Sequence, residues 1–128
     1  MDKKKILLID DEPHVTSVIS HFLIRSGYDV ETANNGLVAL DKVSKRMPDV
    51  IISDIQMPKL TGLGFCERFR TDFSESESLI IIMTSRTERD FREKAGSLEN
   101  VEFFEKPLSP RKIVARLKEY FEEMETVD

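Results

Sequence analysis

The stretch Lys5-Ile6-Leu7-Leu8-Ile9-Asp10-Asp11 decides the fold, because an apolar run ends there in two adjacent acids. A second apolar run, Val50-Ile51-Ile52-Ser53-Asp54, ends in a third acid. Apolar runs of this length between helical patterns are typical of parallel strands that are buried on both faces. Ligands bind at the carboxyl edge of such sheets. We therefore expect Asp10, Asp11 and Asp54 to lie together at a binding edge.

Two further apolar runs also end in polar residues. Leu79 to Met83 is followed by Thr84, and Val101 to Glu105 is followed by Lys106-Pro107. Three acids, a hydroxyl and an ammonium at one sheet edge form a site for a metal ion and a phosphoryl group. Magnesium prefers oxygen ligands and retains several waters, so it suits this set better than a histidine or cysteine cluster, of which the sequence has none.

The chemistry of this set follows from its charges. Clustered carboxylates repel one another and disfavour full ionisation unless a cation is bound. One carboxylate can act as a nucleophile toward phosphorus and form an aspartyl phosphate. A lysine offsets charge on the phosphoryl oxygens, and a threonine hydroxyl donates a hydrogen bond to one of them. Each residue alone would be an ordinary loop acid, strand threonine or solvated lysine, so the hypothesis rests on their joint placement.

The order along the chain is a strand followed by a helix, repeated five times. The strands are predicted near residues 4–9, 28–33, 49–53, 79–84 and 101–105. The helices are predicted after Pro13 to near Gly27, from Asn35 to Arg46, after Gly62, over Thr87–Leu98, and from a cap at Ser109 with Pro110 at the first helical position. This alternation implies a parallel sheet covered on both sides, and the strand order 2-1-3-4-5 is a common solution.

The helices are expected to pack through apolar faces with helical spacing. The predicted faces are Val15, Val18, Ile19, Phe22 and Leu23; Leu37, Leu40 and Val43; Leu63, Cys66 and Phe69 or Phe65; and Ile113, Val114, Leu117, Tyr120, Phe121 and Met124. The segment Thr87–Leu98 offers only Phe91, Ala95 and Leu98, so its helix is expected to be weakly held. Cys66 is interpreted as a small buried hydrophobic residue rather than as a reactive thiol.

The composition is that of one globular domain over residues 1–128. The 128 residues are 40% hydrophobic and 34% charged, and the net charge of −5 argues against non-specific nucleic-acid binding. A single cysteine fits a reducing compartment. The sequence shows no signal peptide and no run of membrane-spanning length, so a cytoplasmic protein is expected.

The motifs resemble those of a known family. Asp10-Asp11-Glu12, Asp54-x-x-Met57-Pro58-x-x-x-Gly62, Thr84-Ser85 and Lys106-Pro107 resemble, in order and spacing, the receiver domain of two-component response regulators. The resemblance covers essentially the whole chain, which on this interpretation is either a stand-alone receiver like the chemotaxis regulators or a piece of a longer regulator. It implies a flavodoxin-like, doubly wound (βα)5 fold. It also implies a signalling phosphoacceptor that promotes its own phosphorylation and autodephosphorylation, rather than an enzyme.

The resemblance assigns roles at the acidic site. It implies that Asp54 is the phosphoacceptor and that Lys106 pairs with the phosphoryl group. Asp11 is expected to bind Mg²⁺ (or Mn²⁺) directly and Asp10 mainly through water. Asp54 and the backbone carbonyl of Gln56 would complete the protein's share of the metal shell.

The resemblance also implies a conformational switch. Thr84 is the expected switch hydroxyl, and Phe103 stands where a tyrosine is frequent in the family; a plain core aromatic is the alternative reading of Phe103. Gln56 and Arg86 occupy two positions that tend to set the phosphoryl lifetime in receivers, and a solvated surface residue is the alternative interpretation of Arg86. The Lys106-Pro107 peptide is a candidate for the cis form.

The chain departs from the family pattern before its last strand. Many receivers carry a Gly-Ala pair there, whereas this sequence has Glu99-Asn100, with Gly96 three positions earlier. Together with the thin apolar face of Thr87–Leu98, this predicts an irregular fourth helix. His14 and His21 are expected at the surface, with His14 at the rim of the acidic pocket.

The implied partners are proteins. They are a sensor histidine kinase or a histidine phosphotransfer protein upstream and an effector protein downstream, without direct nucleic-acid or membrane binding. A phosphorylation-dependent dimer is also possible on this interpretation.

Three other functions share part of this pattern. A phosphatase of the haloacid-dehalogenase type needs an aspartate two residues after its nucleophile, where this chain has Gln56. A flavin or dinucleotide binder needs a glycine-rich loop after the first strand, where Asp10-Asp11-Glu12-Pro13 stands. A receiver-like interaction module that works without phosphorylation is the remaining alternative, and the intact set of acids argues against it.

Overall fold

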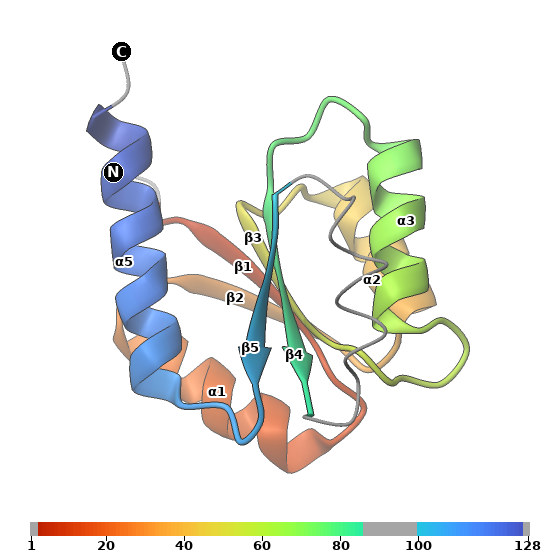
Figure 1. Ribbon diagram of the computed structural model, residues 1–128, viewed down its shortest axis with the longest axis horizontal. Coiled ribbons are helices and arrows are strands. Elements are labelled where there is room, and N and C mark those ends of the chain that lie inside the picture. The colour runs from red at the N-terminus through yellow and green to blue at the C-terminus, as the bar shows by residue number, and fades with distance from the viewer. Residues whose placement is uncertain (1–2, 86–99, 127–128) are drawn as a thin grey trace.

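A five-stranded parallel sheet forms the centre of the molecule (Figure 1). The structure is a computed structural model and describes residues 3–85 and 100–126. The strands are β1 (Lys5–Ile9), β2 (Asp29–Ala33), β3 (Val50–Asp54), β4 (Leu79–Thr84) and β5 (Val101–Glu105). Their order is β2-β1-β3-β4-β5, and all pairs are parallel. The predicted flavodoxin-like strand order is therefore confirmed.

Helices cover both faces of the sheet. The described helices are α1 (Pro13–Arg25), α2 (Gly36–Lys45), α3 (Gly62–Asp72) and α5 (Pro110–Thr126). Figure 1 shows α1 and α5 on one face and α2 and α3 on the other. The helix predicted over 87–98, with its expected irregularity, lies outside the described residues. Over the described ranges, none of the helices is long and apolar enough to cross a membrane.

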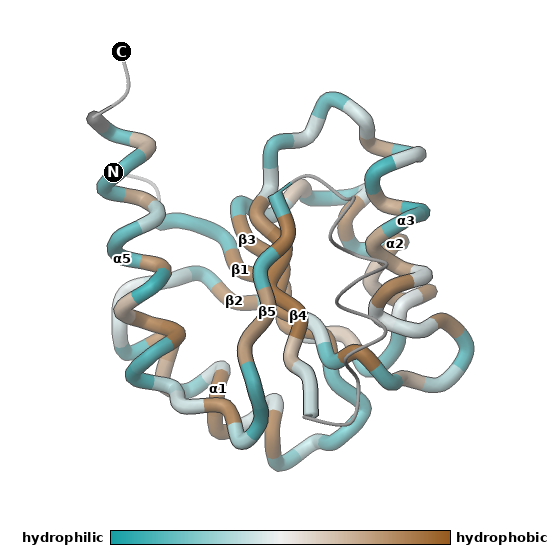
Figure 2. Tube along the Cα trace, in the orientation of Figure 1, coloured by the Kyte–Doolittle hydropathy of each residue, from teal (hydrophilic) through white to brown (hydrophobic). Residues whose placement is uncertain are grey.

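The strand side chains divide the interior into two cores. Along β1, Ile6 and Leu8 face the core beneath α1 and α5, whereas Leu7 and Ile9 face the core beneath α2 and α3. This alternation follows from the two-residue period of a strand. Because both faces are covered, every strand position from Ile6 to Ile9 is buried, and Figure 2 shows the strands as the hydrophobic centre of the chain.

Polar caps start three helices just after the carboxyl ends of strands. The side chain of Asn35 accepts a hydrogen bond from the Val38 amide (2.9 Å), and that of Thr61 accepts one from the Gly64 amide (3.0 Å). The Ser109 hydroxyl accepts one from the Lys112 amide (3.3 Å), so the predicted cap of α5 is present. These bonds satisfy amides that a helix leaves unpaired in its first turn.

Two predicted helix faces are partly wrong. On α1, Ile19 and Leu23 are buried, but Val18 is 58% exposed. On α2, Leu37 is 44% exposed, whereas the smaller residues Gly36, Ala39 and Val43 are buried.

The other two predicted faces are largely correct. The α3 residues Leu63, Phe65, Cys66 and Phe69 are all buried. On α5, Ile113, Leu117 and Phe121 are buried, but Met124 is 49% exposed near the end of the helix. Burial raises the pKa of the Cys66 thiol to about 11, as expected for a packed residue rather than a reactive one.

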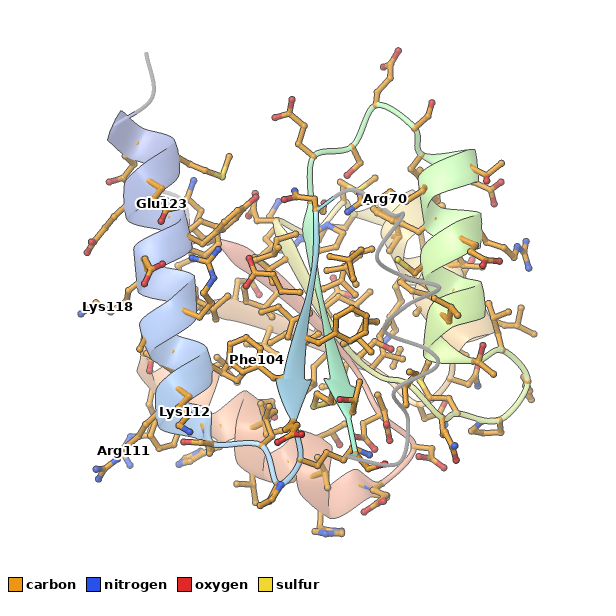
Figure 3. All side chains as sticks on the ribbon, in the orientation of Figure 1. Arg70, Phe104, Arg111, Lys112, Lys118 and Glu123 are labelled. Atoms are coloured by element: carbon orange, nitrogen blue, oxygen red, sulfur yellow. The ribbon has the colours of Figure 1, made fainter. Side chains whose placement is uncertain are left out.

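The edge of the sheet opposite the strand carboxyl ends is held by Arg70 and Asn100. Arg70, labelled in Figure 3, donates to the carbonyl oxygens of Ser78 (2.8 Å) and Asn100 (3.3 Å). Asn100 has a φ of 59° and its side-chain amide donates to the Glu77 carbonyl (2.7 Å). Asparagine tolerates this left-handed conformation, so it supplies the turn into β5 where the resemblance led us to expect a Gly-Ala pair.

We predict that Asn100→Ala lowers the free energy of unfolding by about 1–2 kcal/mol, because alanine is strained at this φ and lacks the amide donor. Asn100→Gly removes the hydrogen bond but relieves the backbone, so its loss should be smaller. Urea unfolding of the two variants measures the difference. Equal stability of the two variants would show that the left-handed backbone at residue 100 carries no cost.

Candidate phosphoryl and metal site

Three carboxylates meet at the carboxyl edge of the sheet. Asp10 follows β1, and its amide donates to the Ala33 carbonyl (3.0 Å), while Asp54 is the last residue of β3. One oxygen each from Asp10, Asp11 and Asp54 lies within 4.8 Å of the others. Asp10 and Asp54 are each only 3% exposed, whereas Asp11 is exposed to solvent. The structure thus brings together the three acids that the sequence places at successive strand ends.

The charges at this edge are unbalanced. Burial raises the pKa of the Asp10 carboxyl, and the nearby Asp54 raises it further, although the Glu12 amide (2.9 Å) lowers it by donating to the carboxylate. Lys106 Nζ lies 2.8 Å from Asp54 Oδ1. With all three carboxylates ionised, the cluster would exceed the Lys106 ammonium by two negative charges. An all-oxygen donor set with this charge fits Mg²⁺ or Mn²⁺.

Thr84 and Lys106 extend the site across the neighbouring strands. Thr84 is fully buried at the end of β4, one residue beyond Met83, which pairs with Asp54. The Thr84 carbonyl accepts a hydrogen bond from the Lys106 amide (2.7 Å). The Lys106-Pro107 peptide is cis, as anticipated. A hydroxyl-bearing side chain and an ammonium therefore lie on the two strands that follow Asp54 in the sheet.

The remaining predicted residues have different surroundings. The Gln56 amide points to Asp54 Oδ1 (3.4 Å), and its side chain is exposed. Phe103 is partly buried against the core beneath α2 and α3. His14 and His21 are exposed, and His14 lines a groove together with Asp10, which agrees with its expected place at the rim. Arg86 lies outside the described residues.

A mostly apolar groove of about 620 Å³ opens beside the acids. It runs between α1 and the turn that leads into α5. Val15, Val18, Met83, Pro107 and Leu108 contribute to its apolar lining, and Asp10 and Lys106 also line it. The exposed Val18, which the helical pattern wrongly assigned to the core, is thus part of this groove.

Gly62 is fixed by contact with the backbone of Asp54. A Cβ atom at residue 62 would lie 2.3 Å from the Asp54 carbonyl oxygen and 2.9 Å from Ile55 Cα. The Gly62 amide donates to the Ile55 carbonyl (2.8 Å). Helix α3 therefore begins directly against the strand end that presents Asp54, and only a residue without a side chain fits there. The sequence motif contains this glycine but does not reveal the contact.

We predict that Gly62→Ala costs about 1–3 kcal/mol of stability, because the new methyl forces α3 and the Asp54 backbone apart. Thermal unfolding measures the loss, and the amide resonances of Ile55 and Gln56 report the displacement. Gly27→Ala is the matched control: with a φ of 99° and open space around its Cβ, it should lose stability without moving the Asp54 resonances. Unchanged Ile55 and Gln56 resonances in a folded Gly62→Ala protein would contradict the contact argument.

Comparison with known sequences identifies relatives of this chain. The sequence model of the response regulator receiver domain matches residues 6–118. The Bacillus subtilis alkaline phosphatase synthesis transcriptional regulatory protein PhoP is 37% identical over 116 residues, which are 90% of this chain and 47% of the relative. The transcriptional regulatory protein CpxR homolog of Haemophilus influenzae is 36% identical over 114 residues, covering 89% of this chain and 48% of the relative. The chain thus spans about half the length of these curated relatives.

Solved structures agree with the sequence comparison. The chemotaxis response regulator CheY4 of Vibrio cholerae superposes with a TM-score of 0.83 at 31% identity, covering 92% of this chain and 98% of that one. A response regulator receiver domain from Clostridium thermocellum gives a TM-score of 0.84 at 26% identity, covering 95% and 97%. Matches in sequence and fold over nearly the whole chain agree with the motifs at the sheet edge, and the chain belongs to the response regulator receiver domain family.

Proposed function

We propose that this protein is a phosphoacceptor in which Asp54 receives a phosphoryl group from a phosphohistidine. The observation that carries the proposal is the nearly buried Asp54 carboxylate, held 2.8 Å from Lys106 Nζ beside two further acids. An Asp54 oxygen attacks phosphorus, the new O–P bond forms as the N–P bond breaks, and the imidazole leaves with the electron pair. The product is an aspartyl phosphate.

Each neighbouring residue has a proposed part in this transfer. Lys106 pairs with the phosphoryl oxygens once they replace the carboxylate as its nearest anion, and Thr84 donates its hydroxyl to one of them. Asp10, Asp11, Asp54 and the Gln56 carbonyl would hold Mg²⁺ or Mn²⁺. When bound, the cation neutralises the carboxylates and the transferred group. Gln56 and the undescribed Arg86 are proposed to influence the phosphoryl lifetime.

The groove beside the acids suits a phosphodonor protein. Its apolar lining and the exposed Val18 offer a contact area for a helix, and Asp10 and Lys106 line the same groove. A helix of a sensor histidine kinase or a histidine phosphotransfer protein that lies in this groove can present its phosphohistidine to Asp54. We propose that this docking takes place in the cytoplasm.

The output is proposed to be a change of surface. In this scheme, Thr84 moves toward the phosphoryl group and Phe103 follows into the vacated space, which alters the face presented to an effector or to a second copy of the chain. The relatives are described as transcriptional regulators. We therefore propose that the output serves gene regulation through protein contacts of this domain rather than through direct binding of DNA by residues 1–128.

Signalling without phosphorylation is the alternative function. A receiver-like interaction module would need no acidic site, yet oxygens of the three acids lie within 4.8 Å of one another and Lys106 pairs with Asp54. Burial raises the pKa of the Asp10 carboxyl, so a site without metal or phosphoryl chemistry has no evident reason to retain this acid. The arrangement favours the phosphoacceptor function.

We expect intact mass spectrometry to show one phosphoryl adduct after incubation with Mg²⁺ and a small acyl phosphate. The adduct should disappear on chelation of Mg²⁺ and in Asp54→Asn, which keeps the shape of the side chain but weakens the nucleophile. Asp41→Asn, an exposed change on α2, is the matched control and should be modified like the wild type. A folded wild type that takes no adduct would favour the phosphorylation-independent module, and an adduct on Asp54→Asn would place the acceptor elsewhere.

Replacement of Phe103 tests the switch. Phe103 packs toward the core beneath α2 and α3, whereas its neighbour Phe104 packs toward the core beneath α1 and α5. With Mg²⁺ and beryllium fluoride as a phosphoryl analogue, Phe103→Ala should keep the amide shifts at Thr84 but lose those along β5 and α5.

Phe104→Ala is the control and should retain the β5 and α5 responses despite lower stability. Wild-type responses along β5 and α5 in Phe103→Ala would leave Phe103 as an ordinary core aromatic.

A further inference from the structure

The loop between β3 and α3 contains a strained turn. The Leu60 amide donates to the Pro58 carbonyl (2.8 Å), which closes a three-residue γ-turn around Lys59. Lys59 has a φ of 70°, a left-handed conformation that non-glycine residues adopt at a cost. Such strain persists only where the surrounding structure enforces it. The loop must therefore be held by contacts elsewhere.

Leu60 makes those contacts in a notch formed by two glycines. A Cβ added at Gly36, the first residue of α2, would lie 2.9 Å from Leu60 Cβ. A Cβ added at Gly64, in the first turn of α3, would lie 2.9 Å from Leu60 Cδ1. The missing side chains leave the space that Leu60 fills, and we call this space the Gly36–Gly64 notch. Leu60 also packs against the core beneath α2 and α3.

Leu60 is the inward-facing residue of the second half of the loop. Pro58, Lys59 and Thr61 are exposed, whereas Leu60 is partly buried. The first half of the loop contains Gln56, whose amide faces Asp54 Oδ1 at 3.4 Å. The Gly62 amide bonds to the Ile55 carbonyl and closes the loop into one unit. Ile55 and Met57, on either side of Gln56, are buried in the same core and hold the first half of the loop. Leu60 holds the second half, so its seat in the notch also bears on the position of the Gln56 backbone.

We propose that Leu60 is a positioning residue for the metal and phosphoryl site, acting through the strained loop to hold the Gln56 backbone against Asp54. This inference rests on the proposed function for its consequence in Mg²⁺ binding. It also links α2 to the site through packing, because Gly36 of α2 forms one wall of the notch that holds Leu60.

Leu60→Ala should loosen the loop and weaken metal binding. In the metal-free protein, amide hydrogen exchange at Gln56 and Gly62 should become faster. Calorimetric titration with Mg²⁺ alone should show a Kd raised by about tenfold, the lower end of the effect of losing support around a metal site. Leu60→Met, which refills the notch with a flexible side chain, should restore most of both properties.

Leu40→Ala is the matched control. Leu40 is a partly buried leucine of α2 that packs against the same core. Its loss should lower the thermal midpoint while leaving Gln56 exchange and the Mg²⁺ Kd at their wild-type values. A role of Leu60 in stability alone would make the two alanine variants behave alike, which would overturn the proposal.

A double-variant cycle tests the notch without relying on metal. Gly64→Ala should destabilise the protein because its methyl collides with Leu60 Cδ1. Leu60→Ala removes that atom, so Gly64→Ala with Leu60→Ala should be more stable than the sum of the two losses predicts. Strict additivity would contradict the packing argument. If Leu60→Ala fails to fold, Leu60→Val takes its place in both tests, because the shorter side chain also lacks Cδ1 and leaves the notch partly empty.

The outcomes separate this inference from the proposed function. A wild type that takes no phosphoryl adduct refutes the phosphoacceptor function, whereas the metal-free exchange data still decide whether Leu60 holds the loop. A wild type that is phosphorylated, together with a folded Leu60→Ala protein of unchanged Gln56 exchange and Mg²⁺ Kd, refutes the role of Leu60 alone.

Discussion

The burial of two carboxylates beside a third, exposed one at the edge of a parallel sheet is the constraint on which the rest of this structure depends. Asp10 and Asp54 are almost fully buried and lie close to Asp11, with Lys106 as the ion-pair partner of Asp54. Such an edge is unfavourable for folding alone, since it holds more negative than positive charge. The two apolar cores, one on each face of the sheet, provide the stability that offsets this unfavourable edge.

Close backbone contacts turn that edge into a defined site. Gly62 brings the start of α3 against the carbonyl of Asp54, so the acceptor strand and the helix that follows it are positioned as one piece. The strained loop between them is short, and its residue Leu60 packs into the Gly36–Gly64 notch. Residues without side chains are therefore as important to the geometry as the charged residues, because they set how closely the elements approach.

Much of the fold could be predicted from the sequence because its signals are local. Apolar runs located four of the five strands, and the ends of these runs located the acids, whereas β2 (Asp29–Ala33) is rich in polar residues and was predicted without such a run. Helix faces were harder to predict. Val18 and Leu37 fit the helical period but are exposed, because the period does not reveal which positions the neighbouring elements cover. The buried positions of α2 are occupied instead by residues as small as Gly36 and Ala39.

Only part of the site could be predicted from the sequence, because some of its contacts depend on packing between distant residues. The acids, Thr84 and Lys106 stand at or just after the ends of predicted strands, so the strand pattern locates them. The packing of Leu60 instead depends on two glycines, one 24 residues before it and one four residues after it. Long-range packing of this kind leaves no periodic pattern. Asn100 was noticed as a departure from the family, but its left-handed turn and its bond to Glu77 required the structure.

The buried state of Cys66 has a practical consequence. It is the one cysteine of the chain; it has no exposed surface, and burial raises the pKa of its thiol to about 11. Thiol reagents attack the thiolate, so this residue reacts slowly in the folded protein. A cysteine introduced at an exposed position would then be the preferred point of attachment for a fluorophore or a spin label. The wild-type chain is thus already suited to distance measurements between its helices without prior removal of a native thiol.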